Sequence, residues 1–308
     1  MVEKVPMSYL RFGLTGLLLL QSAWVLGKQV QLYQAGSTLM TQIIEAGQDK
    51  NGRRKLFLNV PDRFEYRHAF YPLGYWGMLL APVSQDLGDF IWLASPFRPR
   101  TETRSLTTRP LIDKAIKASP FEVNTRGVEA YDQGKLMDSV MWADQTYVTD
   151  YHPDGALTLQ SVGEIRAKPT SPAFLARPKQ VVGTIQNIAT LINATVTWQP
   201  NIATISLTWQ AIAPAQPTDT IFVHLIDADG QVVAQADGDS LNGLIRPSAW
   251  QPGQLIIDQR QIQLNGIPTR GLQVRVGMYS RESGQRYAAL LGSGQLAQDG
   301  ALTIEPLP

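Results

Sequence analysis

The sequence has no cysteine among its 308 residues. That absence excludes disulfide bonds, thiolate nucleophiles and cysteine-ligated zinc, so the fold is expected to depend on packing without covalent cross-links. An excess of charge is also lacking, because 27 Lys and Arg residues against 26 Asp and Glu residues leave a formal net charge of +1. Binding to a phosphate backbone calls for clustered positive charge, and a nucleic-acid partner is therefore not expected.

The common catalytic and cofactor-binding motifs are lacking as well. The sequence contains no G-x-x-x-x-G-K-[ST] phosphate loop, no G-x-S-x-G nucleophile turn, no H-E-x-x-H helix and no G-x-G-x-x-G dinucleotide fingerprint. No cofactor and no metal are expected.

The main apolar run lies near the N-terminus, from Phe12 to Gly27, and follows the basic residues Lys4 and Arg11. At about 16 residues it is shorter than the roughly 20 that cross a bilayer core. Four interpretations of this run stay open. It is a cleaved signal peptide, an uncleaved anchor, the last transmembrane helix of a longer protein or a buried helix of a soluble protein. Trp24 and the weak small-residue signal for cleavage favour the anchor. An anchor places the chain at the cell membrane, with its bulk outside the cytoplasm.

The remainder of the chain divides near residue 170. Residues 1–48 are expected to form the anchor helix and a polar helical stalk, and residues 49–165 a small α/β domain. The proline-containing segment 166–180 lacks periodicity and is interpreted as a linker. Residues 181–308 show short alternating strands separated by Gly, Pro, Asn and Asp, which predicts an antiparallel, immunoglobulin-like β-sandwich. The predicted fold class is therefore α+β.

Individual elements can be expected within these domains. The predicted strands of the first domain are "KLFLNV" (55–60), "MLLAPV" (78–83) and "DFIWLAS" (89–95), and its predicted helices are "PLIDKAIKA" (110–118) and residues 126–141. In the second domain, Ile205, Leu207 and Trp209 alternate with polar residues, which predicts a strand with one buried face.

The segment "DTIFVHLIDADGQVVAQADGDS", residues 219–240, combines a histidine with several aspartates, which are residue types that bind metals. Asp229-Gly230 supplies the positive φ angle that a tight hairpin turn requires. A calcium loop that began at Asp227 would need a bidentate glutamate at its twelfth position, where this sequence has Gly238. The hairpin is the favoured interpretation, and His224 is interpreted as a packed strand residue.

Another group of titratable residues lies in "TDYHPDG", residues 149–155. On an extended strand Asp150, His152 and Asp154 would share a face, as a metal site or an acid–base pair requires. These are the candidate catalytic residues. The proline and the Asp-Gly pair favour a turn instead.

Aromatic residues are the candidates for carbohydrate binding. "YPLGYWG" groups Tyr71, Tyr75 and Trp76 with glycines and a proline, a composition that suits stacking on a sugar ring or a packed turn. Trp198 and Trp250 are candidates on the predicted sandwich, although Trp250 also fits a packed position against its Pro-Gly turn.

Two long segments resemble a known family. "DTIFVHLIDADGQVVAQADGDSLNGLIRPSAWQPGQLIIDQRQIQL" (219–264) and "LQVRVGMYSRESGQRY" (272–287) resemble the C-terminal β-sandwich region of bacterial membrane glycosyltransferases of the dolichyl-phosphate-mannose mannosyltransferase type. Upstream, "LFLNVPDRFEYRHAFYPLGYWG" (56–77) and "DGALTLQSVGEI" (154–165) look like the segments that precede that region.

The resemblance implies a setting in sugar transfer to cell-envelope acceptors. Enzymes of that type carry their catalytic acids on an early loop among many transmembrane helices, and this chain has at most one such helix, so no catalytic residue is carried over. The resemblance implies an accessory or C-terminal region that is not catalytic by itself and that has a multi-helix membrane glycosyltransferase as a partner. There are two alternatives. One is a free-standing carbohydrate-binding module with a glycan partner. The other is a hydrolase or metal enzyme based on Asp150, His152 and Asp154.

Overall fold

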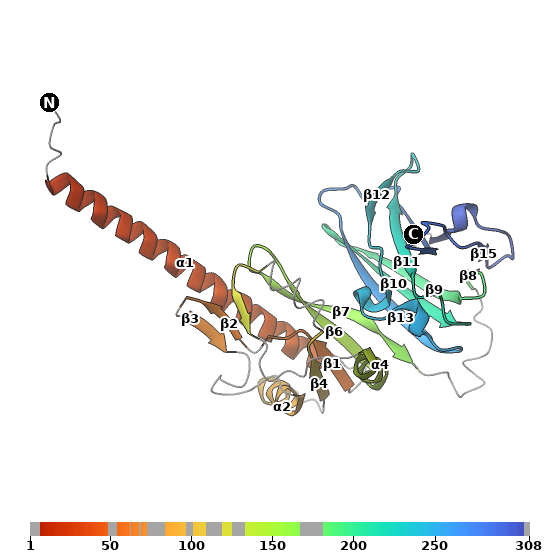
Figure 1. The fold of residues 1–308 in the computed structure, drawn as a ribbon, viewed down its shortest axis with the longest axis horizontal. Coiled ribbons are helices and arrows are strands. Elements are labelled where there is room, and N and C mark those ends of the chain that lie inside the picture. The colour runs from red at the N-terminus through yellow and green to blue at the C-terminus, as the bar shows by residue number, and fades with distance from the viewer. Residues whose placement is uncertain are drawn as a thin grey trace. The chain divides into compact units, whose positions relative to one another are not determined.

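The computed structural model of the chain describes residues 7–48, 54–61, 63–67, 69–72, 84–96, 101–108, 119–124, 133–166 and 181–304. These residues form an α+β fold, as the sequence predicts (Figure 1). The elements up to residue 142 are α1 (Met7–Gln48), β1 (Arg54–Leu58), β2 (Arg63–Tyr66), β3 (Ala69–Pro72), α2 (Ser84–Ala94), β4 (Glu102–Leu106), β5 (Glu122–Asn124) and α4 (Gln133–Trp142).

The later elements are mostly strands. They are β6 (Gln145–Tyr151), β7 (Leu157–Arg166), β8 (Gly183–Ile185), β9 (Ala189–Trp198), β10 (Ile202–Ala211), β11 (Asp219–Ile226), β12 (Val232–Gln235), α6 (Ser240–Gly243), η1 (Pro247–Ala249), β13 (Leu255–Gln263), β14 (Gln273–Ser280), β15 (Ala289–Leu291), η2 (Gln298–Gly300) and β16 (Leu302–Ile304).

The chain divides into two compact units. The first contains residues 1–136 and 147–160, and the second contains residues 137–146 and 161–308. Strands β6 and β7 therefore each pass from one unit to the other. The predicted linker, 166–180, lies outside the described residues apart from Arg166, which ends β7.

Helix α1 runs for 42 residues without a proline, and its two halves differ in their surroundings. In the C-terminal half, Leu32, Ala35, Leu39 and Ile43 recur at helical spacing and are buried in the core of the first unit. The prediction of a polar stalk over this part is therefore wrong, because the helix is buried against other elements of the first unit.

The N-terminal half of α1 carries its apolar side chains on the surface. The four consecutive leucines from Leu17 to Leu20 are between 54% and 71% exposed. In Figure 1 this half, drawn in red, extends beyond strands β2 and β3 of the same unit. Among the residues that the structure describes, no helix is long and apolar enough to cross a membrane.

The sheet of the first unit contains a parallel pair. Strand β1 pairs in parallel with β4, and β6 and the beginning of β7 follow β1 on its other side. A parallel pair requires a crossover connection, and helix α2 lies between β1 and β4 in the sequence. Strands β3, β2 and β5 form a separate antiparallel sheet.

Residues 89–95, predicted as a strand, lie mostly in helix α2, and that prediction is wrong. A short apolar run does not distinguish a strand from a buried helix by its hydrophobicity alone. Leu87 and Ile91, four residues apart, are buried on one face, whereas Trp92 and Leu93 are 38% and 64% exposed. The predicted elements 78–83 and 110–118 lie outside the described residues.

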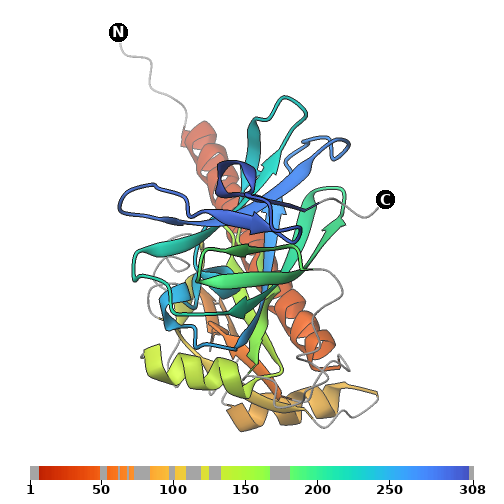
Figure 2. The ribbon, with the colours of Figure 1, turned by 90° about the vertical axis from the view of Figure 1, so that its right-hand side faces the viewer.

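The second unit contains two antiparallel sheets. One has the order β15-β8-β9-β10-β13 with the end of β7 beside β13, and the other has the order β12-β11-β14-β16. Figure 2 shows these strands, coloured from green to blue, from a second direction. The predicted alternation is confirmed in β10, where Ile205, Leu207 and Trp209 are fully buried.

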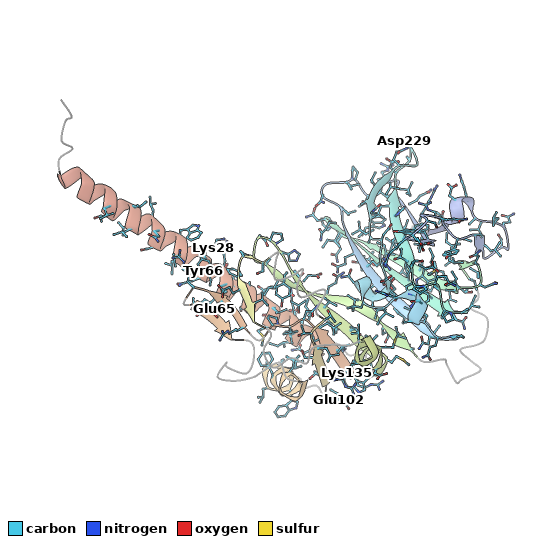
Figure 3. All side chains as sticks on the ribbon, viewed as in Figure 1. Lys28, Glu65, Tyr66, Glu102, Lys135 and Asp229 are labelled. Carbon is cyan, nitrogen blue, oxygen red and sulfur yellow. The ribbon has the colours of Figure 1, made fainter. Side chains whose placement is uncertain are left out.

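The turn between β11 and β12 confirms the hairpin interpretation of residues 219–240. The backbone N–H of Gly230 donates to the carbonyl of Asp227 at 3.1 Å, and Gly230 has a φ of 80°. The Asp227 carboxylate also accepts hydrogen bonds from the backbone N–H groups of Asp229 and Gln231. Asp229 lies at the tip of the hairpin (Figure 3). The Asp227 carboxylate therefore stabilises the turn, as short polar side chains commonly do.

Candidate functional site

The candidate catalytic residues lie at the hairpin between β6 and β7. Asp150 belongs to β6, and His152 and Asp154 belong to the turn that follows it. The N–H of His152 donates to the carbonyl of Ala156 at 3.0 Å. The Asp154 carboxylate accepts a 2.9 Å hydrogen bond from the N–H of Ala156. The turn interpretation is therefore confirmed.

These side chains do not form a metal-binding group. The Nε2 atom of His152 lies 2.9 Å from the hydroxyl of Thr158, so the imidazole is paired with the next strand. No group of three or more His, Asp or Glu residues within the described part of the chain could hold a metal ion.

The aromatic candidates have different locations. Tyr71 belongs to β3, while Tyr75 and Trp76 lie outside the described residues. Trp198 ends β9 and is half-buried. Tyr71 belongs to the first unit, and Trp198 and Trp250 belong to the second.

The prediction of Trp250 as a carbohydrate-binding residue is wrong, because this side chain is only 1% exposed. Its indole N–H donates to the Ser240 hydroxyl at 3.2 Å, and its ring centroid lies 6.4 Å from that of Trp209. Buried tryptophans usually satisfy their N–H in this way. Trp250 is a core residue next to its Pro-Gly turn, the alternative that the sequence also allowed.

An open groove, missed in the sequence, lies on the second unit. Its volume is about 990 Å³, and it is formed by the turn after β8, the loop between β14 and β15, and the segment before β16. The polar residues that line it include Gln186, Ser280, Gln285, Arg286, Tyr287 and Asp299.

Backbone hydrogen bonds hold the three segments of this groove together. The N–H of Gln186 donates to the carbonyl of Ala288 at 2.9 Å, and the N–H of Ser280 donates to that of Gln285 at 3.0 Å. Gly300 has a φ of +63°, and an added Cβ there would lie 2.3 Å from the carbonyl oxygen of Tyr287. Only glycine permits this close approach, so the groove has a defined backbone frame.

The walls of the groove are also fixed by side chains. The Tyr287 hydroxyl donates to the Asp219 carboxylate at 2.7 Å. The guanidinium carbon of Arg286 lies 4.5 Å from the centroid of the buried Phe222 ring, within the range of a cation–π contact. Arg286 is nevertheless exposed and lines the groove.

The hydrogen bond to Asp219 is the main reason why the pKa of Tyr287 rises to about 12, with burial and the charge of the same carboxylate adding to it. The phenol therefore stays protonated in the folded chain at pH values where an unfolded tyrosine, with a pKa of about 10, has ionised. Because the folded pKa is the higher one, the stability from this pair is complete below about pH 10 and is lost as pH rises from 10 to 12.

Tyr287→Phe is expected to remove this part of the pH dependence. In the wild-type chain the free energy of unfolding should fall more steeply between pH 10 and 12 than in the variant, since the other titrating groups are shared by both. Denaturant unfolding at a series of pH values measures the difference. Parallel curves for the two proteins would contradict the assignment of the hydrogen bond to Asp219.

A network of ion pairs and hydrogen bonds, partly buried, supports the segment beside the groove. Arg281, next to Ser280, donates to the Asp239 carboxylate at 2.6 Å and to the Thr220 hydroxyl at 2.9 Å. Asp239 belongs to a segment whose carbonyls accept hydrogen bonds from buried Arg260. The segment beside the groove is therefore linked through Asp239 to the polar network of Arg260 and Asp258.

Comparison of the sequence with models of known protein families found no match, and comparison with curated proteins found none either.

Proposed function

We propose that this chain is a membrane-associated, extracytoplasmic and non-catalytic accessory or C-terminal region of a glycosyltransferase-like membrane protein that acts on cell-envelope glycans. The resemblance of residues 219–264 and 272–287 to such regions supports the glycan setting. We also propose that the two antiparallel sheets of the second unit form an immunoglobulin-like β-sandwich, which the alternating burial along β10 supports.

The exposed apolar half of α1 is the observation that carries the membrane part of this proposal. Leu17 to Leu20 are consecutive, and successive helical residues are about 100° apart, so these leucines surround the helix instead of lining one face. Helices that are apolar on all sides are found in protein cores or in membranes. Lipid, or a bundle of helices in lipid, covers such a surface, whereas one flat partner surface would leave part of it in water.

Aromatic and basic residues lie where this apolar segment ends. The ring centroids of Trp24 and Tyr66 are 6.1 Å apart, and the guanidinium of Arg67 lies 5.8 Å from the Trp24 ring. Lys28 and Tyr66 lie at the same level of the helix (Figure 3). Aromatic rings and basic side chains are enriched at the membrane–water interface, so this level supports a headgroup position.

Flotation with lipid vesicles tests the membrane association. The full chain should float with vesicles of phosphatidylethanolamine and phosphatidylglycerol. In the double variant Leu18→Asp and Leu19→Asp the bound fraction should fall at least about tenfold, because moving a charged carboxylate out of water opposes burial of this segment in lipid.

Val232→Asp is the matched control, since Val232 is an exposed apolar residue on β12, far from α1 in the sequence. Its flotation should equal that of the wild-type chain. The proposal fails if the wild-type chain remains folded, monodisperse and unbound in the presence of these vesicles.

The proposal that the chain is not catalytic by itself needs a separate measurement. The purified full chain is expected not to consume lipid-linked sugar donors by itself, and a photo-crosslinker at Leu19 is expected to label lipid and a polytopic membrane glycosyltransferase. Donor turnover that is lost in His152→Ala would instead support the hydrolase or metal-enzyme alternative.

A further inference from the structure

The groove on the second unit has the size and chemistry of a polar ligand site. Its volume of about 990 Å³ lies at the upper end of the roughly 300–1,000 Å³ of small-molecule sites, so it admits more than one sugar-sized ring. The polar residues that line it are two glutamines, an arginine, an aspartate, two serines and a tyrosine.

The charges of the lining residues indicate a neutral ligand. Arg286 and Asp299 are the charged residues that line the groove, and their formal charges cancel. Tyr287 adds no charge, because a phenol, with an ordinary pKa of about 10, is protonated at neutral pH. A polyanion binds where positive charge accumulates, and this lining provides no such excess.

The hydrogen-bonding groups of the groove match a polyol. Planar amides, a guanidinium and a carboxylate each present two atoms that pair with two adjacent oxygens. Neighbouring hydroxyls of a sugar ring act as both donors and acceptors, and Gln186, Gln285, Arg286 and Asp299 are lining residues of the types that pair with them. Tyr287 is the aromatic residue of the lining, and its hydroxyl is fixed by the hydrogen bond to Asp219. Aromatic rings commonly pack against the apolar C–H face of a sugar.

We infer that this groove is a saccharide-binding site that takes a neutral oligosaccharide segment, with Arg286 as its principal hydrogen-bond donor. Arg286 lines the groove, and the contact of its guanidinium with the Phe222 ring orients the side chain. The choice of a glycan among neutral ligands rests on the proposed setting in cell-envelope sugar transfer. The groove itself is independent of the apolar helix.

Titration of the full chain with mannotriose, maltotriose and cellotriose tests this inference. The protein is held in a zwitterionic detergent, because a maltoside detergent would present the same chemistry to the groove. Saturation-transfer NMR detects binding, and calorimetry gives the affinity. At least one trisaccharide should bind to the wild-type chain, and Arg286→Ala should weaken its affinity on the order of tenfold, as expected for the loss of hydrogen bonds from a charged donor.

Matched variants separate the groove from general effects. Arg270→Ala removes an exposed arginine from the turn before β14 and should leave the affinity unchanged. Arg286→Lys keeps the charge but loses the planar fork, so it should also bind more weakly. If Arg286→Ala fails to fold, as judged by its unfolding temperature, Gln285→Ala takes its place, because the Gln285 side chain is exposed.

The inference is overturned if no trisaccharide binds to the folded chain, if Arg286→Ala binds as tightly as the wild type, or if inorganic phosphate binds while the sugars do not. These results are distinguishable from failure of the membrane proposal. Saccharide binding is measured without a membrane, and vesicle flotation does not involve the groove.

Discussion

Replacing Asp258 by alanine is expected to lower the free energy of unfolding by about 3–5 kcal/mol, the cost of leaving one partner of a buried ion pair without the other. Asp258 is fully buried in β13, and one of its oxygens lies 2.9 Å from Nε of Arg260, which is only 3% exposed. Without the carboxylate, the guanidinium stays in the interior with its charge uncompensated.

The Asp258 carboxylate also holds the chain segment that contains Leu241, in α6. Its other oxygen accepts a 2.8 Å hydrogen bond from the N–H of Leu241, a residue with a φ of 54°. Arg260 donates to the carbonyls of Ala236, Gly238 and Asp239. A left-handed conformation at a leucine persists only where the surrounding contacts impose it. Loss of Asp258 should therefore release this segment as well as the ion pair.

Urea denaturation of the second unit, followed by tryptophan fluorescence, measures this effect. Asp229→Ala, at the exposed tip of the β11–β12 hairpin, is the control and should change the free energy of unfolding by less than about 0.5 kcal/mol, as surface substitutions usually do. The loss of unfolding free energy in Asp258→Asn should lie between the losses in Asp258→Ala and Asp229→Ala, since the amide keeps an acceptor for the N–H of Leu241 but not the charge. A loss below about 1 kcal/mol for Asp258→Ala would show that the ion pair does not anchor this segment.

The parts of the fold that local chemistry controls could be predicted from the sequence. The Asp229-Gly230 pair fixes its hairpin through a positive φ, and the alternation of Ile205, Leu207 and Trp209 reports the two faces of one strand. In both cases the residues that carry the signal are neighbours in the chain. No information about distant segments was needed.

Predictions failed where tertiary packing decides the outcome. Residues 29–48 look polar, yet Leu32, Leu39 and Ile43 are enough to bury one face of α1 in the first unit. Residues 89–95 are apolar enough for a strand, but their helical position becomes evident only when Leu87 and Ile91 are seen on one buried face.

The candidate site could not be predicted because its residues are far apart in the chain. Gln186, Arg286 and Asp299 come from three turns or loops, and none belongs to a recognisable motif. The aromatic residues drew attention for their chemistry, but Trp250 was excluded by its burial. The one local signal was the polar loop "YSRESGQRY", whose position beside Gln186 depends on the pairing of β15 with β8.

Gly163→Ala is expected to destabilise the second unit by about 3 kcal/mol or more, because both the backbone conformation and the available space oppose a side chain at this position. Gly163 lies in β7 with a φ of +113°. An added Cβ would lie 1.8 Å from the carbonyl oxygen of Ile257 and 2.8 Å from its carbonyl carbon. Both contacts are with backbone, so no side-chain rotation relieves them.

Gly266→Ala separates the contribution of the backbone conformation from that of the close contacts of the added Cβ. Gly266 also has a positive φ, +85°, but no atom lies within 4 Å of an added Cβ, so this variant should lose only about 1–2 kcal/mol from its left-handed conformation. Because Gly163 pairs with Asp258 across the two strands, a displacement of β13 would also move the carboxylate away from Arg260. The loss in Gly163→Ala should therefore exceed that in Gly266→Ala in urea denaturation. Equal losses would mean that β7 and β13 separate without cost and that the buried ion pair tolerates their movement.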